Sequence, residues 1–468
     1  MKTATFLYEK IAADFSRQMI NGLLLANDQL PSIRSICSSY QVSMSTALKA
    51  YHILESQGLI HSKPQSGYFV NPVRKLPALP NISVPSPNMG NEDPSALVSK
   101  VYQAVNSGQV MFSLGVPSKA YLPLAKLNKL VCKTVWQLED HASGYENLNG
   151  SANLRRQIAR MSYQWGGQLR EDEILPTAGC TAAMAHCLMA LTEKGDTIVV
   201  ESPIYFGILQ LAKSLGLNIL ELPSHPQTGI DLEALTKSLQ TNKVKLCLLV
   251  PNFSNPMGGT MPVEHKKEVV RLMEHYDIPL VENDMYGDLY FGQERPVNCK
   301  AFDESGLVLL CSSVSKTLAP GYRVGWLTPG KFAEKISRVK FSNTISSSRL
   351  TQEVVASFLE KGRYEQHLKT LRRTLHFNSL RYVEAIEKYF PDDVKVSRPE
   401  GGFMLWIELA KRINTADLYD KAIKLNISIA PGRMFTLQNQ FNNCMRLSYG
   451  LPWNESAHQA IKTIGALL

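Results

Sequence analysis

The sequence predicts a small helical unit that ends in a hairpin, followed by a large α/β domain with a smaller C-terminal lobe. The first observation is length, because 468 residues are too many for one hydrophobic core. The second is a change of pattern near residue 95, where helical periodicity and a proline-rich stretch give way to short apolar runs separated by helices. The third is that polar motifs directly follow those runs, as they do at the ligand sites of open α/β sheets.

Residues 1–71 have the pattern of three helices and a hairpin. Apolar residues recur at every fourth position of the first helix, at Leu7, Ile11, Phe15 and Met19. Asn21-Gly22 ends this helix, Ser32 is a candidate N-cap of the second, and Gly58 ends the third. Leu59-Ile60 and Tyr68-Phe69-Val70 predict two short strands. Three helices followed by a small hairpin are typical of a winged helix-turn-helix, so the unit is predicted to bind DNA.

Candidate DNA contacts lie where such a unit faces a groove. Arg34 stands at the start of the second helix, and Lys63 and Gln65 fall in the wing. The outward face of the third helix carries Ser43, Ser45, Thr46 and Lys49. Hydroxyl and basic side chains bond to phosphates and base edges, and the formal net charge of +9 favours a polyanionic partner. Any exposed helix carries such residues, so the prediction depends on the combined arrangement of helices, turn and wing.

Residues 72–94 are predicted to be an extended, semi-stiff linker. Prolines stand at positions 72, 77, 80, 85, 87 and 94, and large apolar residues are few. The eight cysteines are scattered without a CxxC pair, which predicts a reducing, cytoplasmic location and no metal site. No apolar stretch approaches the roughly 18 to 20 residues that span a bilayer, so no membrane partner is expected.

From residue 95 to residue 468, the pattern is that of a mainly parallel sheet covered by helices. Short apolar runs separated by helical patterns predict buried strands at Thr197–Val200, Leu246–Val250, Pro279–Val281 and Leu307–Leu310. A long helical stretch from about Lys331 and another α/β segment around Gly401–Trp406 predict a smaller second lobe.

Polar residues follow successive predicted strands in an order that indicates an aldehyde cofactor. Asn255 follows one apolar run, Asp284 and Tyr286 follow the next, and Lys316 and Arg323 follow the last. A lysine that forms a Schiff base needs an acid to salt-bridge a pyridinium, an amide and a phenol for a phenolic oxygen, and an arginine for a phosphate. Each residue alone is more often structural, but their joint order makes pyridoxal phosphate the leading cofactor hypothesis.

The helical unit also matches a known family in spacing. The matching segments are Leu30–Arg34, Val42-Ser43, Ala50-Tyr51, Leu54–Ile60 and Ser66–Val70. On these segments, nearly all of residues 5–70 resembles the DNA-binding domain of GntR-type regulators. The chain departs from the family pattern at Asn27-Asp28, where Pro-Gly is usual, and at Met44, where many members have a basic residue.

The C-terminal part carries further motifs. They are Gly144-Tyr145, Leu154-Arg155, Asn255–Gly258, Ser315–Gly321, Arg323–Trp326, Pro399–Phe403 and Arg446–Ser448. With these motifs, residues 95–468 are similar to fold-type I aminotransferases, and the whole chain resembles the MocR subfamily of GntR regulators. The resemblance implies a winged helix joined to an aminotransferase-like domain with a large mixed, mainly parallel sheet and a small C-terminal lobe.

The resemblance implies a role for each residue around the cofactor ring. Lys316 would form the internal aldimine, and Asp284 would hold the pyridine nitrogen protonated, which keeps the ring an electron sink. Asn255 and Tyr286 would bond to the phenolic oxygen of the cofactor. Tyr205 would stack on the ring.

The resemblance also implies how the phosphate and an effector are held. The residues that would hold the phosphate are Gly179, Cys180, Thr181, Ser313 and Arg323. Cys180 is a departure, because enzymes of this type often have serine there, although its backbone N–H can still serve. Tyr145 would reach the phosphate of a partner subunit in a homodimer, and Arg446 would take the carboxylate of an amino acid as a bidentate pair.

Two classes of function are consistent with these residues. In the first, the protein is a transcription regulator in which an amino acid or amine converts the internal aldimine to an external one and so changes binding to a two-half-site operator. In the second, it is a working aminotransferase with a DNA-binding appendage. Both need the same Schiff-base chemistry, and the tethered winged helix favours the regulator. A degenerate site without cofactor is disfavoured because the lysine, acid, amide, phenol and arginine are all present.

Overall fold

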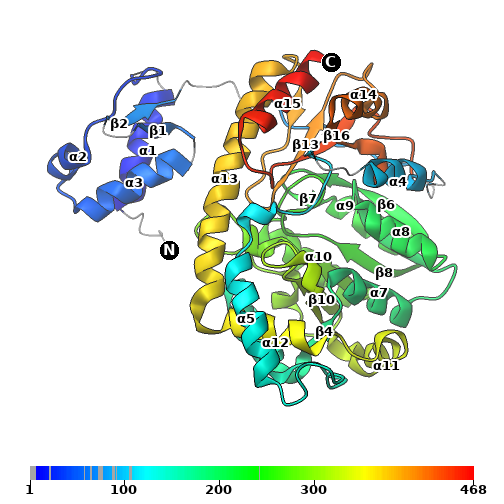
Figure 1. Ribbon diagram of the computed structural model, residues 1–468. Helices are drawn as coiled ribbons and strands as arrows, with labels where there is room; N and C mark the ends of the chain where they lie inside the picture. The colour runs from blue at the N-terminus through cyan, green and yellow to red at the C-terminus, as the bar shows by residue number, and fades with distance from the viewer. Residues whose placement is uncertain are drawn as a thin grey trace. The chain divides into compact units, whose positions relative to one another are not determined.

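The chain folds into two compact units, residues 1–76 and 77–468. Figure 1 shows the computed structural model, which describes residues 7–20, 23–56, 58–63, 66–71, 77–86, 90, 92–104, 108–241 and 243–468. No helix in these ranges has the length and apolar character needed to cross a membrane.

The first unit is a winged helix. Its elements are α1 (Leu7–Ile20), α2 (Ile33–Tyr40), α3 (Met44–Ser56), β1 (Ile60–Lys63) and β2 (Gly67–Val70). The predicted N-cap is confirmed, because the Ser35 N–H donates to Ser32 Oγ at 3.1 Å. Tyr51 is buried in the core and donates to the Pro31 carbonyl oxygen at 2.7 Å, which ties α3 to the turn before α2. The predicted helix end at Asn21-Gly22 lies outside the described residues.

Asn27-Asp28, where the family usually has Pro-Gly, lie at a turn before α2. Asn27 adopts a positive φ of 71°, a conformation that asparagine tolerates better than most residues. The Asp28 carboxylate accepts a hydrogen bond from the Leu25 N–H at 2.6 Å. Proline, whose ring fixes φ at about −65°, could not adopt the conformation of Asn27, so the turn here differs from one that has Pro-Gly at these two positions.

The second unit is built on a large, mainly parallel sheet. In the described part of the chain, eight strands lie in the order β4-β11-β10-β9-β8-β5-β6-β7. Their bounds are β4 (Leu175–Thr177), β5 (Thr197–Ser202), β6 (Asn218–His225), β7 (Gly229–Ile230), β8 (Val244–Leu249), β9 (Leu280–Asn283), β10 (Val308–Ser313) and β11 (Gly325–Thr328). The central run β10-β9-β8-β5-β6 is parallel, whereas β11 is antiparallel to both of its neighbours. The four predicted strands are confirmed as β5, β8, β9 and β10.

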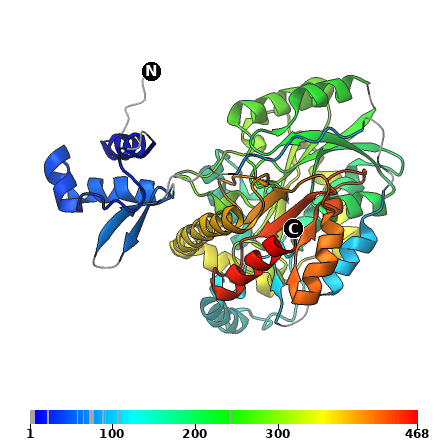
Figure 2. The same cartoon turned by 90° about the horizontal axis from the view of Figure 1, so that it is seen from above.

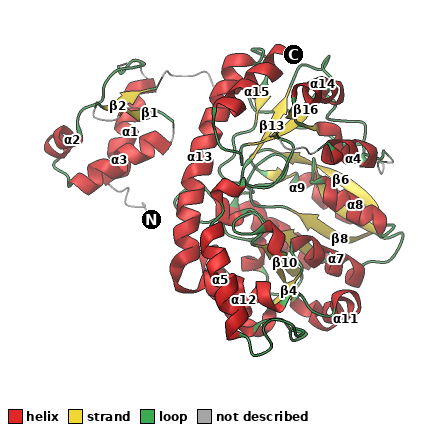
Figure 3. Cartoon of the chain, viewed as in Figure 1, coloured by secondary structure: helices red, strands yellow, loops and turns green. Residues whose placement is uncertain are grey.

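Helices cover both faces of this sheet (Figure 3). On one face, Ile198 and Leu248 pack with residues of α7 (Cys180–Leu191), α8 (Phe206–Ser214) and α11 (Ala333–Thr344). On the other face, Val199 and Cys247 pack with α9 (Leu232–Thr241) and α10 (Val263–Tyr276). Neighbouring residues of one strand thus enter different cores, because side chains alternate across a sheet.

The smaller lobe contains an antiparallel sheet in the order β12-β13-β16-β15. Its strands are β12 (Lys395–Val396), β13 (Met404–Glu408), β15 (Ala430–Pro431) and β16 (Cys444–Ser448), and a parallel pair joins β3 (Val110–Met111) to β14 (Ile427–Ser428). Further helices are α4 (Ser95–Gln103), α5 (Leu124–Gln137), α6 (Ala152–Ser162), α12 (Arg349–Leu359), α13 (Arg363–Tyr389), α14 (Thr415–Ala422) and α15 (Glu455–Ala466). Helices α13 (gold) and α15 (red) lie side by side (Figures 1 and 2).

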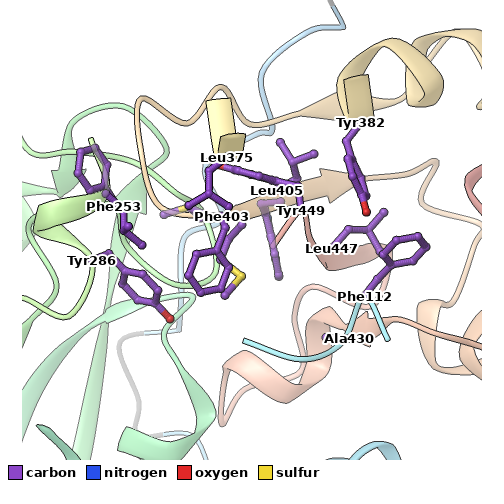
Figure 4. Packing of buried hydrophobic residues seen from close by; sticks show 14 of the residues in the cluster. Phe112, Phe253, Tyr286, Leu375, Tyr382, Phe403, Leu405, Ala430, Leu447 and Tyr449 are labelled. Carbon is purple, nitrogen blue, oxygen red and sulfur yellow. The ribbon is translucent and has the colours of Figure 1, made fainter. Parts of the chain in front are cut away.

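One buried cluster joins the smaller lobe to the end of the large sheet. Figure 4 shows Leu375 and Tyr382 of α13 with Leu405 of β13 and Leu447 of β16. Phe403 belongs to the same cluster, and its ring meets the ring of Tyr286 edge-on, with the centroids 5.5 Å apart. This packing sets the position of the smaller lobe against the loop that follows β9.

The segment expected to be a linker is partly docked. From Pro77 onwards the chain belongs to the second unit, contrary to the prediction of a linker over residues 72–94. The Asn81 N–H and side-chain amide donate to the Glu408 carboxylate at 2.6 and 2.7 Å. The Ser86 N–H donates to Gln438 Oε1 at 2.6 Å. The small number of large apolar residues did not prevent docking, because these contacts are polar and come from residues far along the chain.

Candidate cofactor site

A cavity of about 270 Å³ lies at the carboxyl ends of β8, β9 and β10. Eight of the predicted site residues line it: Cys180, Thr181, Tyr205, Asn255, Tyr286, Ser313, Lys316 and Arg323. Further lining residues include Tyr102, Gly115, Asn283 and Ser315, and of these only Ser315 belongs to a sequence motif. Parallel strands end at the same edge of a sheet, which is why residues so distant in the sequence meet here.

Lys316 stands in the turn after β10, and its amine faces the chain before α5. The Nζ atom donates a hydrogen bond to the Gly115 carbonyl oxygen. Burial, together with the positive charge of Arg446, lowers the pKa of Lys316 to about 8; Cys180 opposes this shift, and Arg323 adds a smaller lowering effect. A larger fraction of the amine is therefore neutral near neutral pH, which is the form that attacks an aldehyde carbon.

A chain of hydrogen bonds runs from Arg446 on β16 to the loop after β9. Arg446 Nη1 donates to Asn255 Oδ1 at 2.9 Å, and Asn255 Nδ2 donates to the Tyr286 hydroxyl oxygen at 3.3 Å. Burial raises the pKa of Tyr286, so its hydroxyl keeps its proton and remains a donor. The Asn255 amide and the Tyr286 hydroxyl therefore lie next to each other, as they must if both are to bond to the same phenolic oxygen.

Arg446 is fully buried and incompletely paired. Its Nη2 donates to the Ser113 carbonyl oxygen, but its Nε has no hydrogen-bond partner among the described residues. Arg446 does not itself line the cavity, but it lies beside Gly115, which does: a Cβ at Gly115 would lie 3.7 Å from Arg446 Nη1 and 3.9 Å from Asn255 Nδ2. A buried arginine with a free donor can bind a carboxylate.

The start of α7 and Arg323 form an anion-binding cradle. Gly179 precedes α7 with a φ of 91°, and Arg323 Nη2 donates to the Ala178 carbonyl oxygen at 3.2 Å. A Cβ at Gly179 would lie 2.4 Å from Arg323 Nη2, and a Cβ at Gly325 would lie 2.6 Å from the Gly179 carbonyl carbon. The glycines therefore permit a close approach of the backbone and the arginine, and the free N–H groups of the helix start suit a phosphate. Hydroxyl groups of Thr181, Ser313 and Ser315 line the same cavity.

The prediction for Asp284 is not supported by its position. Asp284 does not line the cavity; its carboxylate pairs with Arg295 and accepts a hydrogen bond from Asn252 at 3.2 Å. Burial alone would raise the pKa of Asp284, but the charge of Arg295 and these hydrogen bonds hold it below its ordinary value. The residue that reaches the cavity from β9 is Asn283.

Strand alternation explains this difference. Val281 packs in the core on the α7 side of the sheet, and Asn283, two residues later, points to the same side, where its Oδ1 accepts from Cys180 Sγ at 3.4 Å. Glu282 points to the opposite side, where its carboxylate accepts from the Cys299 N–H at 2.8 Å, and Asp284 follows it there. Once Val281 is known to face α7, alternation along β9 assigns Asn283, and not Asp284, to the cavity side.

The two predicted tyrosines have different surroundings. Tyr205 lines the cavity, and its ring lies 4.5 Å from that of Phe206, centroid to centroid. Burial raises the pKa of Tyr205 to about 12. Tyr145 is 84% exposed and does not line the cavity of its own chain.

The predicted DNA contacts of the first unit divide into two groups. Arg34, Lys49 and Lys63 are exposed, and Lys63 Nζ also lies 4.3 Å from the centroid of the Phe69 ring. The Ser43 hydroxyl hydrogen-bonds to the hydroxyls of both Ser45 and Thr46, and Ser43 Oγ accepts from the Thr46 N–H at 3.2 Å. Ser43 therefore caps α3, which is a structural role. Gln65 lies outside the described residues.

Comparison with known proteins agrees with this architecture. Residues 7–70 match the family model of bacterial regulatory proteins of the gntR family, and residues 125–464 match that of class I and II aminotransferases. The molecule is therefore a GntR-type DNA-binding unit fused to an aminotransferase-like domain. The chain belongs to the MocR subfamily of GntR-type transcription regulators. Its cofactor is pyridoxal 5′-phosphate.

Relatives are similar over the whole chain. The chain is 34% identical to the uncharacterized HTH-type transcriptional regulator YjiR and 37% identical to the uncharacterized HTH-type transcriptional regulator YdcR, both of Escherichia coli strain K12, with 98% of each chain covered. Among solved structures it is similar to LysN, an alpha-aminoadipate aminotransferase of Thermus thermophilus, in complex with N-(5′-phosphopyridoxyl)-L-leucine. That likeness has a TM-score of 0.73 and 27% identity, and covers 79% of this chain and 94% of LysN.

The residues of the cavity fit the cofactor in three respects. The amine of Lys316 has a lowered pKa. Gly179 has no side chain that would displace the Arg323 guanidinium from the anion-binding cradle. The Asn255–Tyr286 pair offers hydrogen-bond donors for the phenolic oxygen. They differ from expectation in one respect: of the described residues that line the cavity, none is an aspartate or a glutamate. Nor do His, Cys, Asp and Glu side chains gather into a metal-binding group anywhere in the described part of the chain.

Proposed function

We propose that this transcription regulator senses an amino acid or amine in its aminotransferase-like domain and transmits the binding to its DNA-binding unit. The observation that carries the proposal is Arg446, which is buried next to the cavity-lining Gly115 and whose Nε has no hydrogen-bond partner among the described residues. When bound, pyridoxal phosphate supplies an aldehyde carbon that an amine can hold as a Schiff base, so a ligand amine can replace that of Lys316.

Each group of residues has a task in this proposal. Lys316 would hold the cofactor through its amine, and its lowered pKa leaves more of that amine neutral near neutral pH. Asn255 and Tyr286 orient the ring through its phenolic oxygen, and the start of α7 with Arg323 binds the phosphate. Arg446 binds the ligand carboxylate, which selects α-amino acids over simple amines.

We further propose that the second unit forms a homodimer in which Tyr145 completes the partner's site. Two aromatic side chains near one another in the sequence, Trp136 and Tyr145, are 79% and 84% exposed. Large exposed aromatic residues are enriched where proteins associate. A dimer of the 52.2 kDa chain would present two winged helices to an operator with two half-sites, and sedimentation at twice the chain mass is the expected result.

The test is an absorbance titration of the purified protein against a panel of amino acids and amines. We expect a visible band from the bound cofactor that shifts with at least one ligand. Arg446→Ala should keep the band but weaken the response to α-amino acids on the order of 100-fold or more, since breaking a buried charged pair costs about 3–5 kcal/mol. The control is Arg338→Ala, which removes an exposed arginine that pairs with Glu334 on α11.

Mobility-shift assays connect the site to DNA. Lys316→Ala should bind the operator as the wild type does, because the winged helix is untouched, but its affinity should no longer change with the ligand. A ligand response of normal size in Lys316→Ala would show that the aminotransferase-like cavity is not the sensor.

A working aminotransferase is the second candidate function. It is favoured by the likeness to LysN. The positions of Lys316 and Arg446 that support the sensor would serve an aminotransferase equally. Release of many equivalents of a keto acid per protein chain, with a second keto acid as amino-group acceptor, would establish it.

A further inference from the structure

Asn283 occupies a part of the cavity for which the expected carboxylate is missing. It is 3% exposed, belongs to the last position of β9, and lines the cavity together with Met285 and Tyr286. The adjacent Asp284 cannot substitute, because Arg295 and Asn252 engage both of its carboxylate oxygens on the other side of the sheet.

Several other polar lining groups already match parts of the cofactor other than the ring nitrogen. Lys316 suits the aldehyde carbon, Asn255 and Tyr286 suit the phenolic oxygen, and the Gly179–Arg323 cradle suits the phosphate. In the ring these three substituents stand on adjacent carbons, and the nitrogen lies on the opposite side, across from the aldehyde carbon. Asn283 is the polar side chain of the β9 end that is left for the nitrogen.

We propose that Asn283 is the partner of the ring nitrogen and, being neutral, leaves that nitrogen unprotonated in the bound cofactor. This inference deepens the proposed function and depends on its cofactor assignment. A carboxylate stabilises a pyridinium by its charge, whereas an amide offers only a hydrogen bond, either as acceptor or as donor.

Cys180 determines which end of the amide is available. Its Sγ lies 3.4 Å from Asn283 Oδ1, and its pKa is raised by burial, so the thiol remains a donor to that oxygen. Because the Asn283 oxygen accepts from Cys180, the NH₂ group of Asn283 is the end that can bond to the ring. An NH₂ group can donate a hydrogen bond to an unprotonated ring nitrogen, but not to a protonated one, which carries an N–H. The two departures from the expected residues, Cys180 and Asn283, thus act together.

The surrounding charges favour the same state. The charged groups facing this part of the cavity are cationic, namely Lys316 and Arg323 on its lining and Arg446 beside it. The acids Asp284 and Glu282 point to the opposite side of β9; the charge of Asp284 still acts on Cys180, but its carboxylate is paired with Arg295. A further positive charge on the ring would meet no carboxylate among the described lining residues.

An unprotonated ring withdraws electrons weakly. Removal of the α-proton from a bound amino acid would then be slow, because a neutral ring is a weaker electron sink for the negative charge that develops on the α-carbon. A site of this kind binds an amino acid reversibly without consuming it, which is the behaviour that a sensor needs.

The experiment uses full-length protein loaded with pyridoxal phosphate labelled with ¹⁵N in the ring. At neutral pH, we expect the ring-nitrogen NMR resonance of the wild type at the position of an unprotonated pyridine. Asn283→Asp should move it to the position of a pyridinium. A wild-type resonance at the pyridinium position overturns the proposal by itself, even if Asn283→Asp does not fold.

Two further variants separate the roles of the amide and the thiol. Asn283→Ala should keep the unprotonated state but shift the resonance, because the hydrogen bond to nitrogen is lost; an unchanged resonance would show that Asn283 does not touch the ring. Cys180→Ser keeps a donor to Asn283 Oδ1 and should leave the nitrogen resonance near its wild-type position. Failure of the wild type to bind the labelled cofactor would instead contradict the proposed function, and the two failures are therefore distinguishable.

Discussion

At the scale of single residues, the second unit contains buried acids whose protonation is coupled to folding. Burial raises the pKa of Glu201 to about 8, although hydrogen bonds from the Val250 N–H at 3.0 Å and the Ser224 hydroxyl at 3.4 Å oppose it. Burial also raises the pKa of Glu282 to about 7. Neither acid lines the cofactor cavity, so their effect falls on stability rather than on ligand binding.

We expect Glu201→Gln to stabilise the protein increasingly as pH rises from about 5 to 8. The folded state holds the Glu201 proton up to about pH 8, whereas the unfolded state releases it near 4.5. Between these values the wild type therefore loses about 1.4 kcal/mol per pH unit through this group, and the loss is constant above them. Urea unfolding of wild type and variant at several pH values measures it. Subtracting the unfolding free energy of the wild type from that of the variant cancels the contribution of Glu282, which both proteins share. If that difference did not change with pH, the raised pKa of Glu201 would be contradicted.

At the scale of elements, the junction of β4, α7 and β11 shapes the anion cradle. Gly325 begins β11 directly against Gly179, and β11 pairs with β4 so that Gly325 lies opposite Thr177. The turn before α7 and the strand that follows Arg323 are therefore held together by the sheet itself. The cradle depends on sheet geometry more than on the mobile ends of side chains.

We expect Gly179→Ala to weaken binding of pyridoxal phosphate at least tenfold. A Cβ at this position would lie 2.4 Å from Arg323 Nη2, so the arginine must leave the cradle. Gly195→Ala is the matched control, because Gly195 also has a positive φ, 93° against 91°, but has nothing within 4 Å of an added Cβ. Both variants should lose about 1 kcal/mol of stability through backbone strain, and only the first should lose cofactor affinity. Equal affinities by fluorescence titration would exclude the cradle as the phosphate site.

At the scale of the whole molecule, the docked segment 77–86 connects the DNA-binding unit to the lobe that carries Arg446. Glu408 on β13 holds Asn81, and β13 pairs directly with β16, where Trp406 lies opposite Arg446. The loop after β15 contributes Gln438, which holds Ser86. We therefore expect a movement of this lobe on ligand binding to be transmitted to the segment through hydrogen bonds of one small sheet.

We expect Glu408→Ala to reduce the ligand's effect on operator affinity while leaving cofactor binding unchanged. Two hydrogen bonds to Asn81 are lost, which should free the segment and expose it to proteases. Glu334→Ala on α11 is the control, because Glu334 pairs with Arg338 of its own helix. Mobility-shift assays with and without ligand, together with limited proteolysis between residues 77 and 86, provide the measurement. A full ligand response despite rapid cleavage would place the coupling elsewhere.

Much of this molecule follows from local sequence. Apolar periodicity and caps such as Ser32 predicted the helices of the winged unit, and apolar runs predicted β5, β8, β9 and β10. The chain order of Asn255, Tyr286, Lys316 and Arg323 predicted a cavity lined by all four, because parallel strands end at one edge. These features depend on spacing along the chain, which the sequence contains in full.

The tertiary structure alone decided which residue of a neighbouring pair faces the cavity and where the chain docks. Asn283 and Asp284 are equally plausible in sequence, but the direction of each side chain follows from the alternation of β9 and from the Arg295 ion pair on its far side. The docking of Asn81 on Glu408 joins residues 327 positions apart, and no local pattern encodes it. Strand orientation and long-range polar pairing arise only when the sheets assemble, and they determine here whether a charged or a neutral group lies in the cofactor site.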